Sequence, residues 1–418
     1  MGAHVALRYL TAGESHGKAL VAIVEGLPAG LPVSAEQVDR DLGRRMMGYG
    51  RGARMKIERD RIEWLSGVRA GETLGSPVAM LIHNRDWSNW EDVMAAEGTP
   101  GEERRRQVFR PRPGHADLVG VLKYDRQDAR DILERASARE TAARVAAGAL
   151  GRRLLEEFGV DIGSHLVSLG GIRAMPPAAL PLPLNAAADR SEIRVLDPEV
   201  EEQIIRRIDQ AKKEGDTLGG ECEVVVRGLP AGLGSHVHWD RKLDGRLAGA
   251  LMSIQAVKAV EIGMGFEASR RPGSEVHDSI DASATPGRPA AAPALRGGYR
   301  RRSNNAGGLE GGMTTGEPLI IRVGMKPIAT LMAPLPTIDL RTGLPAKAQS
   351  ERSDVTAVPA MGVIAEALTA FVLADALVEK FGGDSLREMQ RNWQAYLAQL
   401  AERWARLADG AALPVEET

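Results

Sequence analysis

The sequence predicts a fold of mixed helices and strands, α+β or α/β, built from two related halves. Residues 13–31 align without a gap with residues 215–233, and nine of the 19 positions are identical. A second match pairs residues 71–77 with residues 312–318, each just before an apolar run that is typical of a strand. Because the matching segments occur in the same order, we expect two βαβ-like halves related by an approximate internal two-fold axis.

Each half ends in a long apolar helix, predicted over residues 141–158 and residues 361–381. The first of these is rich in alanine and carries apolar residues on most faces, which is typical of a buried helix. We therefore place the halves at about residues 5–160 and 200–385, packed together as a single domain over residues 1–390.

Cap and turn signals divide the first half into elements. Ser34 and Gln37 have the spacing of a capping box, which predicts a helix that ends at about Met47. Ser137 and Glu140 repeat this spacing ahead of the alanine-rich helix. The other predicted elements are an apolar run over 5–12, strands over 19–24, 55–66 and 76–83, a glycine-rich arginine loop over 48–52 and a surface loop over 95–108.

Composition guides the interpretation of the second half in the same way. Residues 174–198 are rich in Pro and Ala, which indicates a connector. Residues 304–312 are dense in glycine, which predicts a turn where the backbone closely approaches another segment. The other predictions are a strand over 222–226, a helix over 239–253, a loop or insertion over 269–302 with its Pro- and Ala-rich part at 282–300, polar clusters at 326–330 and 351–356, and an exposed helical tail over 391–418.

Composition and charge exclude several classes of protein. The chain has 418 residues and a formal net charge of -2, without the basic surplus that nucleic-acid binding usually needs. Cys222 is its only cysteine, so no intrachain disulfide is possible and a reducing cytoplasm is the expected compartment. No apolar run approaches the length of a membrane span, and residues 1–10 lack the apolar core of a signal peptide. We expect a soluble cytoplasmic protein.

The segment 110–117 predicts a rigid turn that presents a histidine. Pro111 and Pro113 fix φ at alternate positions and Gly114 permits a bend, so His115 is held beside arginines. This is costly local structure for a connector. The alternative interpretation is a surface turn that happens to contain a histidine.

The internal repeat helps to separate structural residues from functional ones. Gly13 and Gly17 both recur in the second half, which indicates turn residues. His16 is replaced by Leu218 at the equivalent position. Because the fold accepts leucine there, it does not require an imidazole, and a functional role for His16 is favoured.

Arginines and one carboxylate indicate an anion site. The loop 48–52 lacks the Gly-Lys-Ser/Thr ending of a P-loop, so Arg45 and Arg51 are better interpreted as ligands that clasp a phosphate or carboxylate, although a solvated charged turn is the alternative. Asp354 follows Arg352 closely, either in a structural ion pair or as a base in an anion-rich cleft, and the spacing leaves both open.

The histidines offer no metal site. His236 and His238 alternate along a predicted strand, but no Cys pair, His-Glu-x-x-His helix or aspartate-rich loop accompanies them. We interpret both as surface residues and expect no metal.

Several of these segments together resemble the chorismate synthase family, over about residues 7–383. The resemblance rests on specific blocks that occur in the family's order. These blocks are residues 13–17, 48–55, 112–117, 135–145, 215–220, 302–314, 326–330 and 352–359.

The resemblance implies a lyase of the shikimate pathway, in aromatic amino acid biosynthesis. Members of the family catalyse an anti 1,4-elimination of phosphate from 5-enolpyruvylshikimate 3-phosphate to give chorismate, and they require reduced FMN although there is no net redox change. The family fold is a β-α-β sandwich with helices between two antiparallel sheets, usually assembled as a homotetramer.

The resemblance also assigns roles to residues. His16 would protonate or stabilise the departing phosphate, His115 would supply a proton at the flavin ring, and Asp354 would assist removal of the ring hydrogen together with the flavin N5. The residues implied for the anions of the substrate, or of NADP, are Arg45, Arg51, Arg112, Arg139 and Arg352. The implied flavin contacts are Arg135, Ala136, Ser137, Gln255, Ala256, Gly311, Lys326, Pro327, Ile328, Ala329, Thr330 and Arg352.

Two other classes of function fit the sequence less well. A flavin-binding protein without lyase activity would be favoured by the loss of His16, His115 or Asp354, and all three are present. An arginine-rich RNA-binding scaffold is disfavoured by the charge balance and by an aromatic content of 4%. The sequence leaves open whether the protein reduces its own FMN with NADPH, and which arginine meets which anion.

Overall fold

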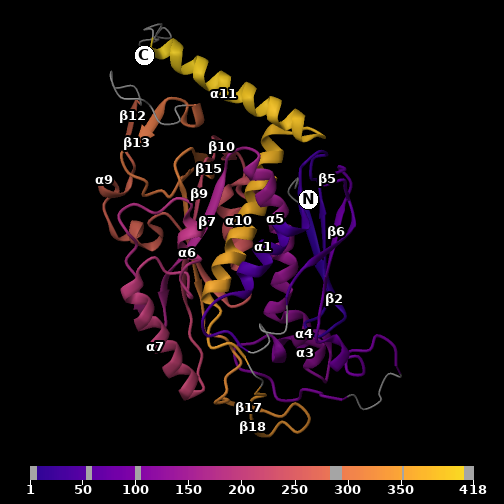
Figure 1. Cartoon of the computed structure of the whole chain (residues 1–418). Helices are drawn as coiled ribbons and strands as arrows, with labels where there is room; N and C mark the ends of the chain where they lie inside the picture. The colour runs from indigo at the N-terminus through magenta and orange to yellow at the C-terminus, as the bar shows by residue number, and fades with distance from the viewer. Residues whose placement is uncertain (1–6, 53–58, 99–104, 283–293, 351–352, 409–418) are drawn as a thin grey trace.

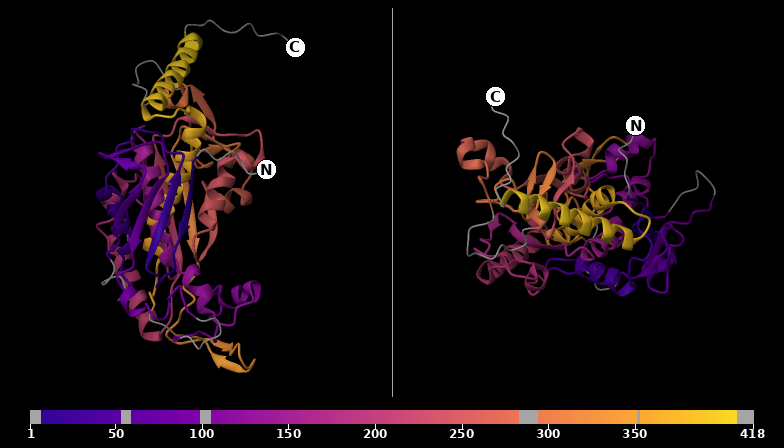
Figure 2. Two further views of the ribbon diagram at one scale, coloured as in Figure 1. Left: turned by 90° about the vertical axis from the view of Figure 1, so that its right-hand side faces the viewer. Right: turned by 90° about the horizontal axis from the view of Figure 1, so that it is seen from above.

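The fold is a sandwich in which two antiparallel sheets enclose a layer of helices (Figures 1 and 2). A computed structural model describes residues 7–52, 59–98, 105–282, 294–350 and 353–408. In this part of the chain the arrangement agrees with the expected β-α-β sandwich of mixed helices and antiparallel strands.

The first sheet belongs to the first half of the chain. Alternate residues of its second strand, Leu20, Ala22 and Val24, are buried toward the helices, as period-two patterning requires. Leu10 and Ile23, which are register partners, face the opposite side and are exposed. The strand order is β1 (Arg8–Ala12), β2 (Ala19–Glu25), β6 (Val78–His83) and β3 (Ile62–Ser66).

The second sheet repeats this order with strands from residues 161–173 and from the second half. Its order is β11 (Val257–Ile262), β16 (Leu319–Met325), β9 (Gly220–Arg227), β7 (Asp161–Leu169) and β8 (Ile172–Arg173). The pairs β2–β6 and β9–β16 are therefore equivalent, and each lies at the centre of its sheet.

Matching hydrogen bonds confirm the internal repeat. The Thr73 hydroxyl donates to the carbonyl of Pro28 at 2.6 Å and accepts the N–H of Leu31 at 3.0 Å. Thr314, its counterpart in the second match, donates to the carbonyl of Pro230 at 2.6 Å and accepts the N–H of Leu233 at 2.8 Å. The two halves thus share a turn that is fixed by the same side-chain interaction.

The helices between the sheets carry the core. Helix α5 (Thr141–Glu156) packs against β2, and α10 (Val358–Phe381) packs against β7 and β9, while α5 and α10 pack on each other. A Cβ atom on Gly148 would lie 2.3 Å from the carbonyl oxygen of Ala367, so only glycine permits this approach. Helices α1 (Ala35–Met46) and α8 (Leu243–Met252) flank this pair and pack against α10.

Local signals predicted some boundaries and missed others. The capping box at Ser34 and Gln37 is confirmed, but the one at Ser137 and Glu140 is wrong. Ser137 instead caps a 3-10 turn over Ala138–Glu140, because the Glu140 carboxylate accepts hydrogen bonds from Thr11, Arg144 and Gln255. Tertiary partners therefore outcompete the local cap.

Several elements differ from the sequence predictions. The connector 174–198 contains α6 (Leu184–Ala188), and α7 (Pro198–Glu214) follows with Asp197 as its N-cap, a signal that the prediction overlooked. The helix over 239–253 is a 3-10 turn, Trp239–Arg241, followed by α8. His236 and His238 are exposed, as expected, but they lie beyond the strand that ends at Gly234.

Shorter elements complete the description. The glycine-dense turn is confirmed as a close approach, since a Cβ on Gly307 would lie 2.3 Å from the amide nitrogen of Gly263. Of the strand predicted over 55–66, residues 53–58 lie outside the described part of the chain. The remaining helices and strands are β4 (Val68–Arg69), β5 (Glu72–Thr73), α3 (Asp117–Tyr124), α4 (Arg130–Ala136), β10 (Ala231–Gly234), α9 (Gly273–Val276), β12 (Ile280–Ala282), β13 (Tyr299–Arg301), β14 (Leu309–Glu310), β15 (Met313–Thr315), β17 (Pro336–Ile338) and β18 (Pro345–Lys347).

The C-terminal helix α11 (Leu386–Ala408) confirms the helical tail but corrects its exposure. Trp393 is buried, and its ring packs edge-on against Phe158 and Phe381. The first turns of α11 therefore belong to the core. The expectation that no apolar run approaches the length of a membrane span is wrong for α10, which alone among the described residues is long and apolar enough to cross a membrane. However, 89% of its most apolar window is buried inside the protein.

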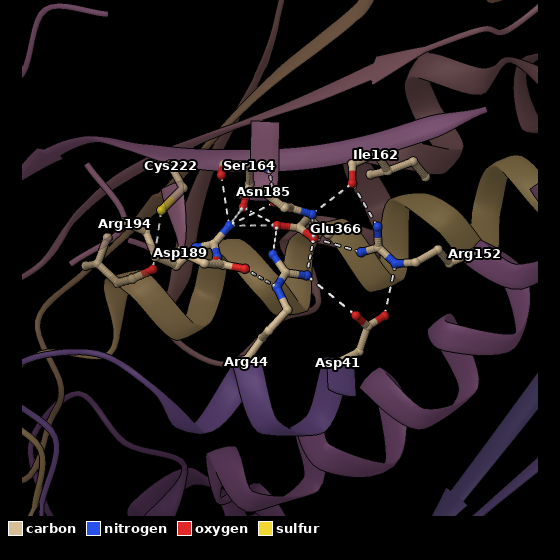
Figure 3. A network of polar contacts seen from close by, with 11 residues as sticks. Asp41, Arg44, Arg152, Ile162, Ser164, Asn185, Asp189, Arg194, Cys222 and Glu366 are labelled. Atoms are coloured by element: carbon tan, nitrogen blue, oxygen red, sulfur yellow. Dashed lines mark hydrogen bonds and ion pairs between the residues drawn. The ribbon is translucent and has the colours of Figure 1, made fainter. Parts of the chain in front are cut away.

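A buried ion cluster joins the helix layer to the second sheet (Figure 3). The Glu366 carboxylate on α10 accepts hydrogen bonds from Arg44 at 2.8 and 3.0 Å, Arg152 at 2.7 Å and Arg194 at 3.0 Å. The carboxylates of Asp41 and Asp189 balance the remaining positive charge. Because Arg44 lies on the last turn of α1, the cluster anchors the helix from which the glycine-rich loop 48–52 departs.

Candidate active site

A cavity of about 540 Å³ brings together residues from both halves of the chain. Its walls come from the turn before β2, the segment around His115, the end of α4, the turn after α8, the segment after β16 and the start of α10. The predicted site residues that line it are His16, His115, Asp354, Arg45, Arg51, Arg112, Ala136, Ser137, Gln255, Ala256, Lys326, Ile328, Ala329 and Thr330.

His16 is held by a buried carboxylate. Its Nδ1 lies 3.0 and 2.9 Å from the two carboxylate oxygens of Glu134, and its backbone N–H donates to the same group at 2.9 Å. The ring also stacks on Trp90, with 3.9 Å between the ring centroids. Because Nδ1 faces Glu134, proton exchange with a ligand in the cavity falls to Nε2.

His115 has a similar arrangement on a different element. Gly114, at φ +79°, makes the bend that the sequence predicts, and the His115 Nδ1 lies 2.5 Å from a carboxylate oxygen of Asp117. Arg112 donates from its Nε to the other oxygen of Asp117 at 2.9 Å and from its Nη1 to Thr330 at 2.8 Å. Burial would raise the pKa of Asp117, but the hydrogen bonds and charges of His115 and Arg112 lower it well below its ordinary value.

Asp354 connects the glycine-rich loop to the cavity. One carboxylate oxygen accepts the N–H of Gly52 at 2.5 Å, and the other lies 3.1 Å from the Nε of Arg51. Asp354 therefore forms an ion pair with Arg51, a residue far away in the sequence. Arg352, its sequence neighbour, lies outside the described residues.

Arg45 is buried at the back of the cavity. Its guanidinium donates to the Thr141 hydroxyl at 2.9 Å and to the Ala138 carbonyl at 3.0 Å, and Asp60 lies 3.4 Å away. Burial lowers the pKa of Arg45 to about 10 although Asp60 opposes this effect, so the side chain stays cationic at neutral pH.

Some predicted residues do not line this cavity. Arg139 points to Asp60 at 2.5 Å and to Asn84 at 2.9 Å. Arg135 donates to the carbonyls of Gly13 and Thr11, which ties α4 to the turn between β1 and β2. The other two are Gly311, in the turn between β14 and β15, and Pro327, which packs close to Gly219.

Sequence reasoning missed the two carboxylates that hold the histidines. Asp117 lies two residues after His115, so the motif itself carried a signal for it. Glu134 is separated from His16 by 118 residues, and no local pattern pairs them. Trp90, which covers the His16 ring, comes from a segment with no motif of its own.

A second cavity of about 710 Å³ adjoins the first at the glycine-rich loop. The two cavities share four lining residues, Arg51, Thr330, Ser353 and Asp354. The Arg51–Asp354 ion pair therefore lies at the boundary between them. Within the described ranges, no cluster of three or more His, Cys, Asp or Glu side chains could hold a metal ion.

Comparison with known proteins gives a consistent result. The chorismate synthase family profile matches residues 7–378. Chorismate synthases from Symbiobacterium thermophilum and Thermobifida fusca are 57% and 54% identical over 402 and 404 residues, covering 95% of this chain and 100% of each relative. A crystal structure of a chorismate synthase superposes with a TM-score of 0.74 at 43% identity, covering 95% of this chain and 98% of that one.

Proposed function

The chain belongs to the chorismate synthase family, and we propose that it catalyses the anti 1,4-elimination of phosphate from 5-enolpyruvylshikimate 3-phosphate to give chorismate. The observation that carries the proposal is the cavity between the two halves, which His16, His115 and Asp354 line together with three arginines. Membership of this family supports the proposal of a lyase of the shikimate pathway.

The cationic side chains match the charge of this substrate, which bears one phosphate and two carboxylates. Arg45, Arg51, Arg112 and Lys326 line the cavity, against the single carboxylate of Asp354 among the proposed site residues. Arginine suits such anions because its planar guanidinium can bind phosphate or carboxylate through two N–H groups. We propose Arg45, Arg51 and Arg112, together with Arg139 and Arg352, as the substrate or NADP ligands.

His16 is proposed as the group at the leaving phosphate. In the elimination, the substrate loses a ring hydrogen and its phosphate while a carbon–carbon double bond forms, with no net oxidation. Nδ1 is engaged with Glu134, so Nε2 donates a proton or a hydrogen bond to the phosphate oxygen as the C–O bond breaks. The other histidine, His115, is assigned the proton at the flavin ring, with Asp117 behind its Nδ1.

Asp354 is proposed to assist removal of the ring hydrogen. In the described structure its carboxylate is held by Arg51 and by the N–H of Gly52. A substrate anion that pairs with Arg51 competes with Asp354 for the same guanidinium. Binding of substrate would thereby release a carboxylate oxygen for proton transfer next to the reacting ring.

Several of the flavin contacts that the resemblance implies lie in the cavity wall. The Oε1 of Gln255 is buried and accepts no hydrogen bond within the described part of the chain, so it suits an N–H of a bound flavin. Ala256 has φ +65°, a conformation that non-glycine residues rarely adopt and that often marks a ligand contact. When bound, reduced FMN supplies transient electron density for a C–H bond that an ordinary base removes slowly. The proposed flavin set also contains Arg135, Ala136, Ser137, Gly311, Lys326, Pro327, Ile328, Ala329, Thr330 and Arg352.

We propose a cytoplasmic homotetramer for the assembled enzyme. The outer face of the first sheet supports this proposal, because Leu10 is 70% exposed and its neighbour Ile23 is 39% exposed. Adjacent apolar side chains on an uncovered sheet face are typical of a surface that another subunit covers.

Anaerobic incubation with reduced FMN and 5-enolpyruvylshikimate 3-phosphate tests the proposal. Stoichiometric release of phosphate and chorismate is expected. Protein that binds FMN but releases neither product would contradict it, and would favour a flavin-binding protein without lyase activity. Repeating the assay with oxidised FMN and NADPH as the only reductant determines whether the protein reduces its own flavin.

A further inference from the structure

The carboxylate of Glu134 contacts both the imidazole ring and the backbone N–H of His16. Both carboxylate oxygens lie within 3.0 Å of the His16 Nδ1, and one of them also accepts the backbone N–H of His16. The side chain of Glu134 is 1% exposed, whereas that of His16 is 16% exposed and lines the cavity. One buried group therefore fixes both the main chain and the ring of a residue that faces the ligand space.

The surroundings of Glu134 hold this carboxylate in place. Arg130, one turn earlier on α4, donates to it at 2.8 Å, and the Glu134 carbonyl accepts the N–H of Ser15. Burial would raise the pKa of Glu134, but the hydrogen bonds from His16 and the charge of Arg130 lower it, so the group is ionised at neutral pH. An ionised carboxylate only accepts hydrogen bonds, so the Nδ1 of His16 must carry the proton.

Trp90 restricts the ring from the side. Its ring stacks on His16 at an interplanar angle of 22°, and the guanidinium groups of Arg106 and Arg130 lie 4.4 and 5.1 Å from the Trp90 ring centroid. With Nδ1 bound and one face covered, the imidazole has little freedom to rotate. The other titratable side chains that line the cavity with His16 are Arg45, Arg51, Arg112, His115, Lys258, Lys326 and Asp354.

We propose that Glu134 is a positioning residue, which fixes the Nδ1–H tautomer of His16 and directs Nε2 toward the departing phosphate. This inference rests on the proposed function for its catalytic consequence. When Nε2 gives its proton to the phosphate oxygen, Nδ1 keeps its own proton on Glu134. The imidazole is then left neutral in the correct tautomer, and the carboxylate does not change its protonation state.

Glu134→Gln tests this role, because the amide keeps the shape but loses the charge and can also present a donor to Nδ1. We expect kcat to fall roughly 10- to 1000-fold with little change in KM, as is typical when an acid–base group is misoriented. Asp131→Asn is the matched control, since Asp131 is an exposed carboxylate on the same helix. This control should retain full activity.

A second readout does not depend on turnover. Acylation of each histidine by diethyl pyrocarbonate, which attacks a neutral ring, is followed by peptide mass spectrometry against pH in flavin-free protein. In Glu134→Gln, the midpoint for His16 should move to lower pH, because the imidazolium has lost its anionic partner, while the midpoint for His115 should stay unchanged.

The outcomes separate this inference from the proposed function. A lower kcat with an unchanged His16 midpoint would show a merely structural role and would overturn the proposal, as would full activity in Glu134→Gln. If the wild-type protein lacked lyase activity but Glu134→Gln still shifted the His16 midpoint, the Glu134–His16 coupling would be supported and the lyase rejected. Should Glu134→Gln not fold, Arg130→Gln is measured instead. Loss of that cation should raise the His16 midpoint, and no change would count against the proposal.

Discussion

The buried Glu366 cluster allows a quantitative prediction for Glu366→Gln. Each carboxylate oxygen of Glu366 accepts three hydrogen bonds, from Arg44, Arg152 and Arg194 and from the side chains of Ser164 and Asn185. The side chain is 0% exposed, so water cannot solvate the arginines in place of the lost carboxylate charge. The NH2 group of the introduced glutamine also points its N–H donors at the arginine guanidinium groups, which repel it.

Removal of one partner from a buried ion cluster costs about 3–5 kcal/mol. With an entropy of unfolding of roughly 2 cal/mol/K per residue, a chain of 418 residues has about 0.9 kcal/mol/K, so the Tm should fall by roughly 3–6 °C. Differential scanning calorimetry of the flavin-free protein measures this shift. Glu25→Gln is the control, because its pair with Arg8 is exposed and such pairs contribute about 0–1 kcal/mol.

A Glu366→Gln variant with the same Tm as the wild-type protein would refute this prediction. It would mean that Asp41 and Asp189 alone neutralise the three arginines. An equal loss of Tm in Glu25→Gln would show instead that the assay does not distinguish buried from exposed pairs.

Three further predictions concern the site and its pH dependence. His16→Ala and His115→Ala should each lower kcat roughly 10- to 1000-fold with the oligomer intact, as measured by phosphate release and size-exclusion chromatography; full rates in both would reject the assigned roles. Gln255→Ala should weaken FMN binding roughly 5- to 100-fold in a fluorescence titration, because a buried acceptor is lost, and an unchanged Kd would remove Gln255 from the flavin site. The folded-state pKa of Glu366 lies well below its ordinary value of 4.5, because the charges of Arg44, Arg152 and Arg194 outweigh the effect of burial. The stability that this carboxylate contributes is therefore complete above pH 4.5, and it should be lost as the pH falls from there through the folded-state pKa. Acid titration followed by circular dichroism should show a weaker loss in Glu366→Gln, and parallel curves would contradict this account.

The sequence predicted the fold through its internal repeat. A repeated turn must make the same contacts in each half, which is why the segments that carry Thr73 and Thr314 match each other in the amino-acid sequence itself. Elements without a recognisable repeat in the sequence were missed, such as β7 and α7, although Asp197 and Gly215 cap α7 at its two ends.

The site was predictable where one short segment carries several functional groups. His115 and Arg112 lie within one turn, so proline and glycine chemistry sufficed to identify this segment, although the role of Asp117 in the same turn was overlooked. The partners of His16 and Asp354 are distant in sequence and are set by how α4 and the glycine-rich loop pack. Such pairings depend on tertiary structure, and no spacing rule encodes them.

A crystal structure with FMN and 5-enolpyruvylshikimate 3-phosphate bound would show directly whether one cavity holds both ligands. We predict the substrate phosphate within hydrogen-bond distance of the His16 Nε2, about 2.7–3.2 Å, and the flavin ring between His115 and Asp354 in the same cavity. A phosphate bound more than about 6 Å from His16, or a flavin bound outside the cavity that Gln255 and Lys326 line, would contradict it.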